Sequence, residues 1–451
     1  LNNGDSILKY GAIIGHATRD IAMGEHVHSH NLASNAIAIF HHDDAGYQSE
    51  EKHNGRLCTA NGRPGIRNTV QVIFMVECAS HVAKKIAEGF PCHDVQYFGF
   101  SGCYPSDYGY RLVKNLATHS NVGGVLIISL GCENFDRRRL EQEVRESGRP
   151  CHTLVIQENK GTTNTITLGK QLVAEMLEQL ADTPRCILNW SDLVVGTICG
   201  GSDGTSGITG NPAVGRAFDQ LLEKGATCIF EESGELLGCE QHMMSRAASS
   251  QARDAIEVAM TKAERYYSLM GLGSFSNGNA EGGLTTQEEK SLGAYTKSGD
   301  ALIAGVILPT QQTPFPGLWL MDVVPDGEPR FGYPNINDSS EALELIASGC
   351  HMVLFTTGRG LVIGSVIAPI IKVCNNPQTW EHLSDDMDVN AGRVISEGAT
   401  LDDIADDIMQ VIEHVAKRSI LCRRTMEHQE FVLTYKAFDY SKSAVCRADP
   451  R

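Results

Sequence analysis

Three cysteines of this chain lie in glycine-flanked positions shortly after hydrophobic runs. They are Cys103, Cys132 and Cys199. If the three runs are neighbouring parallel strands, their carboxyl ends share one edge of a sheet and the sulfurs could converge there. Three thiolates without a fourth protein ligand suit an iron ion or an iron–sulfur cluster with one open position, whereas structural zinc takes four ligands. The alternative interpretation is that cysteine simply fits these tight turns.

A second candidate metal site is the segment from His26 to Asn31, which contains His26, His28 and His30. If the segment is a strand, side chains two residues apart share a face, and the three imidazoles point the same way. Such a cluster could bind a metal or a substrate carboxylate. A polar edge strand that faces water is the alternative.

Cys199 also begins a glycine-rich loop that ends at Gly207 and leads into a helix start with Pro212 in its first turn. Backbone N–H groups and the helix dipole favour an anion such as a carboxylate or phosphate here. The loop lacks the Gly-Lys-Ser/Thr ending of a Walker loop. A simple turn does not require its polar side chains, so we predict substrate binding by Ser202, Asp203, Thr205 and Ser206.

Further charged candidates follow other runs. Glu231 and Glu232 come after a short hydrophobic run and could bind a divalent cation or supply a general base, although a solvated acidic turn is the alternative. Arg359 lies in a polar glycine turn and suits bidentate recognition of a carboxylate.

The segment 271–299 is rich in Gly, Ser, Asn and Thr with little periodicity, and we expect it to be a functional loop. Near its end Thr285, with Glu288 three residues later, indicates the start of a helix that carries Lys290. Lys290 is therefore either an acid–base candidate or an exposed helix lysine.

Such strand-end residues need a scaffold of parallel strands. From Gly65 to about Gln179, and again from Leu193 to Lys417, hydrophobic strands alternate with amphipathic helices, which predicts parallel sheets. The fold class that we predict is α/β, with a small β-rich N-terminal domain followed by parallel-sheet α/β catalytic domains. The predicted boundaries are 1–45 for the β domain, 46–60 for a linker, 61–188 for the first α/β domain and 189–451 for the second.

Composition narrows the function class. The chain has 451 residues and a net charge of -17, which argues against nucleic acid and anionic membranes as partners. Its hydrophobic runs are shorter than a membrane-spanning helix, and its first residues do not resemble a signal peptide. Fourteen cysteines without a Cys-x-x-Cys pair indicate reduced thiols. We expect a cytoplasmic protein that acts on a small molecule and is compatible with a homo-oligomer.

Six segments together resemble the altronate/galactarate dehydratase family. They are 61–68, 131–133, 199–211, 282–293, 355–360 and 386–392. The segment around His26 and His28 resembles the small SAF domain that precedes the catalytic part in that family. The chain departs from the family's pattern at 322–333, where members commonly have a Pro-Gly turn followed by Thr-Gly and a small-residue helix.

The resemblance implies a hydro-lyase that removes water from an altronate- or galactarate-like 2,3-dihydroxy carboxylate and gives a 2-keto-3-deoxy acid. It also implies dependence on Fe²⁺ or Mn²⁺, with an iron–sulfur cluster as the alternative. Related lyases eliminate sulfite from sulfolactate, so a sulfo-lyase is a second hypothesis and a non-catalytic sugar-acid-binding protein is a third.

A β-elimination of this kind needs a cationic group that stabilises the enediolate, a base, and an acid for the leaving hydroxyl. For acid–base work we predict Lys290, His28 or Glu232. The predicted substrate-carboxylate ligands are the Ser202–Ser206 loop and Arg359. The metal would bind either His26 and His28 or the cysteines Cys103, Cys132 and Cys199.

Overall fold

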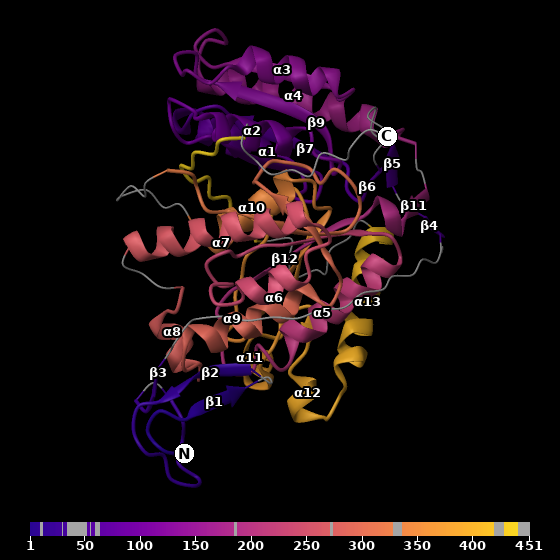
Figure 1. Cartoon of the computed structure of the whole chain (residues 1–451). Coiled ribbons are helices and arrows are strands. Elements are labelled where there is room, and N and C mark those ends of the chain that lie inside the picture. The colour runs from indigo at the N-terminus through magenta and orange to yellow at the C-terminus, as the bar shows by residue number, and fades with distance from the viewer. Residues whose placement is uncertain are drawn as a thin grey trace.

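The computed structural model describes residues 1–9, 12–28, 30–33, 52–54, 56–58, 64–184, 187–270, 274–327, 336–418 and 428–440. A small β-rich part is followed by two parallel-sheet α/β units (Figure 1), which confirms the predicted fold class. Most of the predicted linker 46–60 lies outside the described residues. The described part of the chain contains no helix that is long and apolar enough to cross a membrane.

The N-terminal part is a three-stranded antiparallel sheet of β1 (Ser6–Lys9), β2 (Ala12–Ala17) and β3 (Leu32–Ala33). Its small core consists of Ile7, Ile14, Ala17, Ile21 and Leu32. In Figure 1 this indigo sheet lies at the bottom of the molecule, beside α8 and α9.

Two short antiparallel pairs connect the N-terminal part to the rest. They are β4 (Lys52–Asn54) with β11 (Ile187–Asn189), and β5 (Arg56–Cys58) with β6 (Pro64–Gly65).

The first α/β unit has a parallel sheet in the order β10-β9-β7-β8. Every residue of β7 and β9 is buried, because helices cover both faces of a parallel sheet. Helix starts follow local capping rules: Ser106 accepts from the Gly109 N–H before α2, and Asp136 accepts from the Arg139 N–H before α3. The strands are β7 (Thr69–Phe74), β8 (Val95–Gly99), β9 (Val122–Ser129) and β10 (Cys151–Val155), and the helices are η1 (Glu77–Ala79), α1 (Ser80–Ala87), α2 (Asp107–Ala117), α3 (Arg137–Glu146) and α4 (Thr162–Ala181).

The second α/β unit has a seven-stranded parallel sheet in the order β14-β15-β13-β12-β16-β17-β18. Its strands are β12 (Val194–Cys199), β13 (Thr227–Phe230), β14 (Ile303–Ile307), β15 (Leu318–Met321), β16 (Met352–Thr357), β17 (Ile370–Cys374) and β18 (Val389–Asn390). Its helices are η2 (Trp190–Asp192), α5 (Gly210–Glu223), α6 (Glu240–Ser245), α7 (Ser250–Met270), α8 (Asn277–Glu281), α9 (Gln287–Tyr295), η3 (Thr296–Ser298), α10 (Asp338–Ala347), α11 (Pro377–Leu383), α12 (Arg393–Ser396) and α13 (Leu401–Arg418).

The strand order places a topological switch point beside β12. After β12 the chain first builds the β13 side of the sheet and then returns to add β16, β17 and β18 on the other side. In open α/β sheets, ligands bind beyond the carboxyl ends of the strands at such a point. The carboxyl end of β12 is Cys199.

The segment 271–299 is not the long loop that its composition predicts. Most of its described residues form α8, α9 and η3. Hydroxyl caps start both α-helices, because Ser276 accepts from the Asn279 N–H and Thr286 accepts from the Glu289 N–H. The cap of the Lys290 helix is thus Thr286, one residue later than predicted. Two of the polar residues that made this segment look like a loop, Ser276 and Thr286, are the caps of these helices.

Candidate active site

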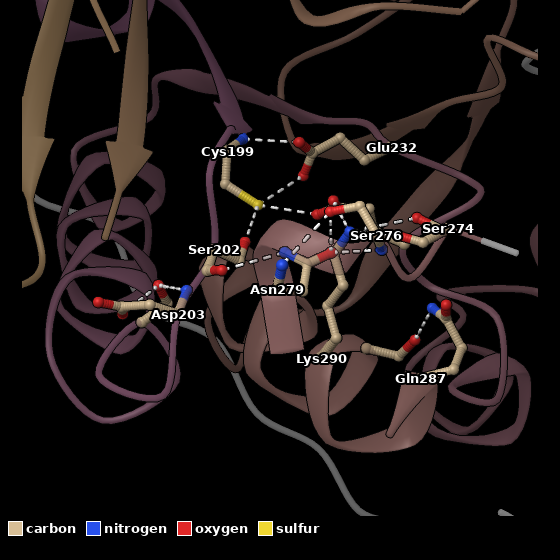
Figure 2. Close-up of polar contacts among 12 residues, drawn as sticks. Cys199, Ser202, Asp203, Glu232, Ser274, Ser276, Asn279, Gln287 and Lys290 are labelled. Carbon is tan, nitrogen blue, oxygen red and sulfur yellow. Dashed lines mark hydrogen bonds and ion pairs between the residues drawn. The ribbon is translucent and has the colours of Figure 1, made fainter. Parts of the chain in front are cut away.

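Cys199 lies between two acidic side chains, of which Glu232 is buried and Glu235 is partly buried. Its Sγ is 3.2 Å from Glu232 Oε2 and 2.9 Å from Glu235 Oε2, and its backbone N–H donates to Glu232 Oε1 at 2.7 Å. In the described part of the chain, this is the group in which three potential metal-ligand atoms lie within 4.8 Å of one another. Figure 2 shows the sulfur facing Glu232, with Lys290 reaching toward the same space from α9.

Two buried lysines pair with the two carboxylates. Lys297 Nζ contacts Glu232 Oε2, and Lys290 Nζ lies 2.6 Å from Glu235 Oε1. Both lysines are at least nine-tenths buried, so Lys290 is not an exposed helix lysine. Each of the two carboxylates therefore has a lysine partner, which offsets part of the cost of placing an acidic group inside the protein.

The backbone at Glu232 is strained. Its φ of 84° lies in the left-handed region, which is costly for a residue with a side chain, by roughly 1–3 kcal/mol. The contacts with Cys199 and Lys297 hold it there. Such strain concentrates at functional sites, and here it points the carboxylate at the sulfur.

Burial and the neighbouring Glu235 raise the pKa of the Cys199 thiol to about 12. Without a cation, the sulfur is therefore a neutral thiol that donates to the carboxylates. A bound divalent cation would reverse this preference, because metal ligation stabilises the thiolate. One sulfur and two carboxylates in reach of each other fit a divalent ion such as Fe²⁺, which accepts both donor types.

More carboxyl groups line the start of α10 beside the site. Burial and Glu235 raise the pKa of Asp338 to about 6, and burial raises the pKa of Glu341 to about 8. Burial also raises the pKa of Glu231, whose two side-chain oxygens have no hydrogen-bond partner in the described structure. At neutral pH Glu341 and Glu231 therefore favour the protonated form, whereas Asp338 is mostly ionised, so the site has proton donors as well as carboxylates nearby.

The glycine-rich loop after Cys199 is fixed by its own side chains. Asp203 Oδ1 accepts from the Thr205 N–H and hydroxyl and from the Ser206 hydroxyl, while Oδ2 accepts from Asn376 Nδ2. Figure 2 shows Asp203 directed away from Cys199. Asp203, Thr205 and Ser206 therefore shape the loop, whereas Ser202 Oγ stays 3.6 Å from the sulfur.

Arg359 borders this loop but is engaged elsewhere. Its Nη1 donates to the Gly278 carbonyl at 2.6 Å and lies 3.3 Å from Glu281 Oε2. The side chain is 41% exposed. It thus ties the β16 turn to α8 and keeps a solvent-accessible guanidinium beside the loop.

The N-terminal histidines lie between β2 and β3, outside the strands. The rings of His26 and His28 stack with centroids 5.3 Å apart, and those of His28 and His30 with centroids 6.5 Å apart. Buried Asn31 shapes this turn by donating to the His26 carbonyl and accepting from the His28 N–H. In the part of the chain described, the histidines do not form a group of three ligand atoms within 4.8 Å, so the geometry favours the Cys199 group as the metal site.

The three cysteines do not lie on one edge of a sheet, because the strands that precede them belong to different sheets. Cys103 and Cys132 follow β8 and β9 of the four-stranded sheet and are exposed, whereas Cys199 ends β12 of the seven-stranded sheet and is buried. The expected single edge does not exist. Which strands share a sheet depends on pairing between segments far apart in the sequence, and the local sequence pattern does not encode that pairing.

Two further residues of the site lay outside the predicted set. Glu235 is three residues after Glu232, and Lys297 is seven residues after Lys290. A spacing of seven places two side chains on the same face of a continuing helix, and α9 does continue into η3. That spacing was the available signal for Lys297.

Comparison with known proteins supports this architecture. The family model "D-galactarate/Altronate dehydratase, C-terminal" matches residues 190–438, which include the whole Cys199 group. The model "D-galactarate dehydratase/Altronate hydrolase, second domain" matches 58–181, and the model "Altronate/galactarate dehydratase SAF domain" matches 1–35. The chain belongs to the D-galactarate/altronate dehydratase family.

Named relatives agree with this assignment. The chain is 30% identical to the altronate dehydratase of Bacillus subtilis (strain 168) over 96% of its own length and 89% of the relative's. It is 27% identical to the altronate dehydratase of Escherichia coli (strain K12), over 95% and 88%. It is also 32% identical to the (2R)-sulfolactate sulfo-lyase subunit beta of Chromohalobacter salexigens, over 83% and 95%. The prediction of a hydro-lyase is confirmed at the level of the family, because the named dehydratases are hydro-lyases.

Proposed function

We propose that the protein removes water from a sugar acid of the altronate or galactarate type, a 2,3-dihydroxy carboxylate, and yields a 2-keto-3-deoxy acid. The observation that carries the proposal is the Cys199, Glu232 and Glu235 group at the switch point of the sheet, with Lys290 and Lys297 beside it. The names of the dehydratase relatives support the substrate class.

A divalent ion, Fe²⁺ or Mn²⁺, would be held by Cys199, Glu232 and Glu235. When bound, it would supply the positive charge that stabilises an enediolate and polarises a leaving hydroxyl. The donor set fits because the three ligand atoms lie within 4.8 Å of one another and the donors are a thiol and carboxylates.

The protein's own groups divide the remaining work. A β-elimination needs one group that accepts the proton next to the carboxylate and one that protonates the leaving hydroxyl. Lys290, whose Nζ pairs with Glu235 beside Cys199, is the proposed acid–base residue, because Glu232 is assigned to the metal. The Ser202 hydroxyl would bind the substrate carboxylate, since most backbone N–H groups of the loop after Cys199 already donate within the protein. Arg359 would contribute to substrate binding from the solvent side of this loop.

The test is turnover by metal-depleted protein before and after anaerobic addition of Fe²⁺ or Mn²⁺. We expect altronate or galactarate to give a 2-keto-3-deoxy acid only in the metal-loaded protein. Equal turnover in metal-free protein would refute the metal's role, and absence of turnover with every sugar acid would refute the dehydratase.

A sulfo-lyase is the second candidate, favoured by the 32% identity to the sulfolactate lyase subunit. The same reaction mixtures with sulfolactate, assayed for sulfite, separate the two functions. Release of sulfite without any dehydration of sugar acids would replace the first proposal by the second.

A further inference from the structure

The N-terminal sheet is docked on the helix that carries Lys290. Lys9, the last residue of β1, forms an ion pair with Glu289 of α9. The Thr286 hydroxyl donates to the Ile14 carbonyl of β2 at 3.0 Å, and Leu292 packs against the small N-terminal core. Charged, polar and apolar contacts thus all join the two parts at α9, as their adjacency in Figure 1 illustrates.

Glu289 is the central residue of this contact. Its side chain is fully buried, and one carboxylate oxygen faces Lys9. The other oxygen accepts from the Thr285 N–H at 2.8 Å and from the Thr285 hydroxyl. A single carboxylate therefore ties β1 to the first turn of α9. Loss of Lys9 would leave a buried carboxylate without this cation, which is strongly unfavourable.

The next residue along the helix reaches the candidate site. Consecutive helix residues point about 100° apart, so Glu289 can face the N-terminal sheet while Lys290 faces the interior. Lys290 Nζ is 2.6 Å from Glu235 Oε1, and Glu235 Oε2 is 2.9 Å from Cys199 Sγ. The chain of contacts from Lys9 to Cys199 is continuous through one rigid helix.

We propose that docking of the N-terminal domain holds Lys290 in place, with Glu289 as the positioning residue that joins the two. The catalytic consequence rests on the proposed function, but the coupling of Lys9 to the order of α9 does not. The N-terminal domain is then part of the machinery of the active site, although it contributes none of the three proposed metal ligands.

The experiment compares Lys9→Met with Arg19→Met in the full chain. Arg19 pairs with Glu25 inside the same domain, so its substitution removes an N-terminal cation and a more exposed ion pair that does not reach α9. Amide hydrogen exchange of residues 287–295, measured without substrate, is the first readout. We expect about tenfold faster exchange there in Lys9→Met and no change in Arg19→Met. Unchanged protection of α9 in Lys9→Met overturns the proposal.

Kinetics of the metal-loaded enzyme provide the second readout. We expect Lys9→Met to lower kcat by about tenfold with a KM within about twofold, because a displaced Lys290 impairs the chemical step more than binding. Lys9→Arg, which keeps a cation opposite Glu289 and leaves the contacts of Glu289 with Thr285 intact, should retain both α9 protection and kcat. Turnover in Lys9→Arg as slow as in Lys9→Met, with normal protection of α9, overturns the link to catalysis. If the wild-type protein has no dehydratase activity, the proposed function fails while the exchange result still decides the coupling.

Discussion

The sulfur of Cys199 holds a position that no other described cysteine shares. It lies between two carboxylates that each have a lysine partner, so removal of the sulfur alone changes the proposed metal site without leaving a carboxylate unpaired. Serine keeps a polar donor at the same place but lacks the soft ligand that iron prefers. The substitution therefore isolates the role of the thiol.

We predict that Cys199→Ser lowers Fe²⁺ affinity by at least about tenfold, within the range known for lost ligands and ligand supports, and abolishes most activity. Anaerobic titration with Fe²⁺ measures the affinity. Cys103→Ser and Cys132→Ser are the controls, because both residues are exposed and lie on the other sheet. Iron loss in either control would contradict the proposed site and favour a cysteine cluster.

Glu341 gives a prediction about pH. Its folded-state pKa of about 8 lies above the ordinary value of 4.5 because the side chain is buried. Above about pH 4.5 the folded protein therefore holds a proton that the unfolded chain has released. The stabilisation from this proton is fully present below that pH and is lost as the pH rises through 8. Between pH 5 and pH 8 the free energy of unfolding should fall by about 2–4 kcal/mol from this group.

Glu341→Gln keeps the shape of the neutral acid and should remove that loss. Chemical denaturation at pH 5 and pH 8 should show a smaller pH dependence in the variant than in the wild type. Glu178→Gln, at an exposed position of α4, is the matched control and should behave as wild type. Identical pH profiles for Glu341→Gln and wild type would mean that Glu341 is ionised in the folded protein.

At the scale of elements, local pattern predicted most helices and strands but not their partners. The alternation of hydrophobic strands and amphipathic helices matches β7 to α4 closely, since each element there carries its own periodicity. It does not single out β15, which has four residues, or β17, whose apolar run contains Lys372. Lys372 is buried beside His428, a contact between residues 56 positions apart that the strand's own sequence does not reveal.

The candidate site illustrates the same limit. Cys199, Glu232 and Lys290 were identifiable because each follows a strand or a cap signal, and the fold brings them together. The association of Cys199 with Cys103 and Cys132 was wrong because it required strand order. Strand order depends on which chain segments pair at long range, and neither composition nor spacing contains that information.

The close approach of α5 to η3 offers a test at the level of elements. A Cβ on Gly215 of α5 would lie 2.1 Å from the Thr296 carbonyl oxygen, so an alanine must push η3 away. Lys297, the next residue, would lose its place beside Glu232. Gly215→Ala should cost about 1–3 kcal/mol of stability, a typical penalty for overpacking, and reduce metal affinity.

Gly278→Ala is the control for this substitution. Its Cβ would meet its nearest neighbour at 3.6 Å, an ordinary contact, so thermal stability and metal affinity should stay near wild type. A stable Gly215→Ala variant with normal iron binding would show that η3 can move without consequence for the site.

For the whole molecule, two buried histidines lie at the contact between the two α/β units. His119, before β9 of the first unit, lies 3.2 Å from the Cys350 carbonyl of the second, and its Nδ1 accepts from the Asn121 N–H. His351 of the second unit accepts from the Val194 N–H and contacts the Pro64 carbonyl. Because backbone groups fix the neutral form of His119, the interface depends on this ring remaining uncharged.

This interface predicts a loss of stability in acid. Burial, followed by the nearby His351 and Arg149, lowers the pKa of His119 to about 3, whereas an unfolded histidine titrates near 6.5. The unfolded chain therefore binds the proton first, and the stabilisation is present above about pH 6.5 and falls as pH decreases toward 3.

Between pH 7 and pH 5, protonation of this histidine in the unfolded chain should lower the free energy of unfolding by about 2 kcal/mol. His119→Gln should be less stable at pH 7 but should lack that share of the pH dependence. Thermal unfolding at both pH values measures the effect, with His81→Gln at an exposed position of α1 as control. A His119→Gln variant that loses as much stability as wild type on acidification would place the acid sensitivity elsewhere in the molecule.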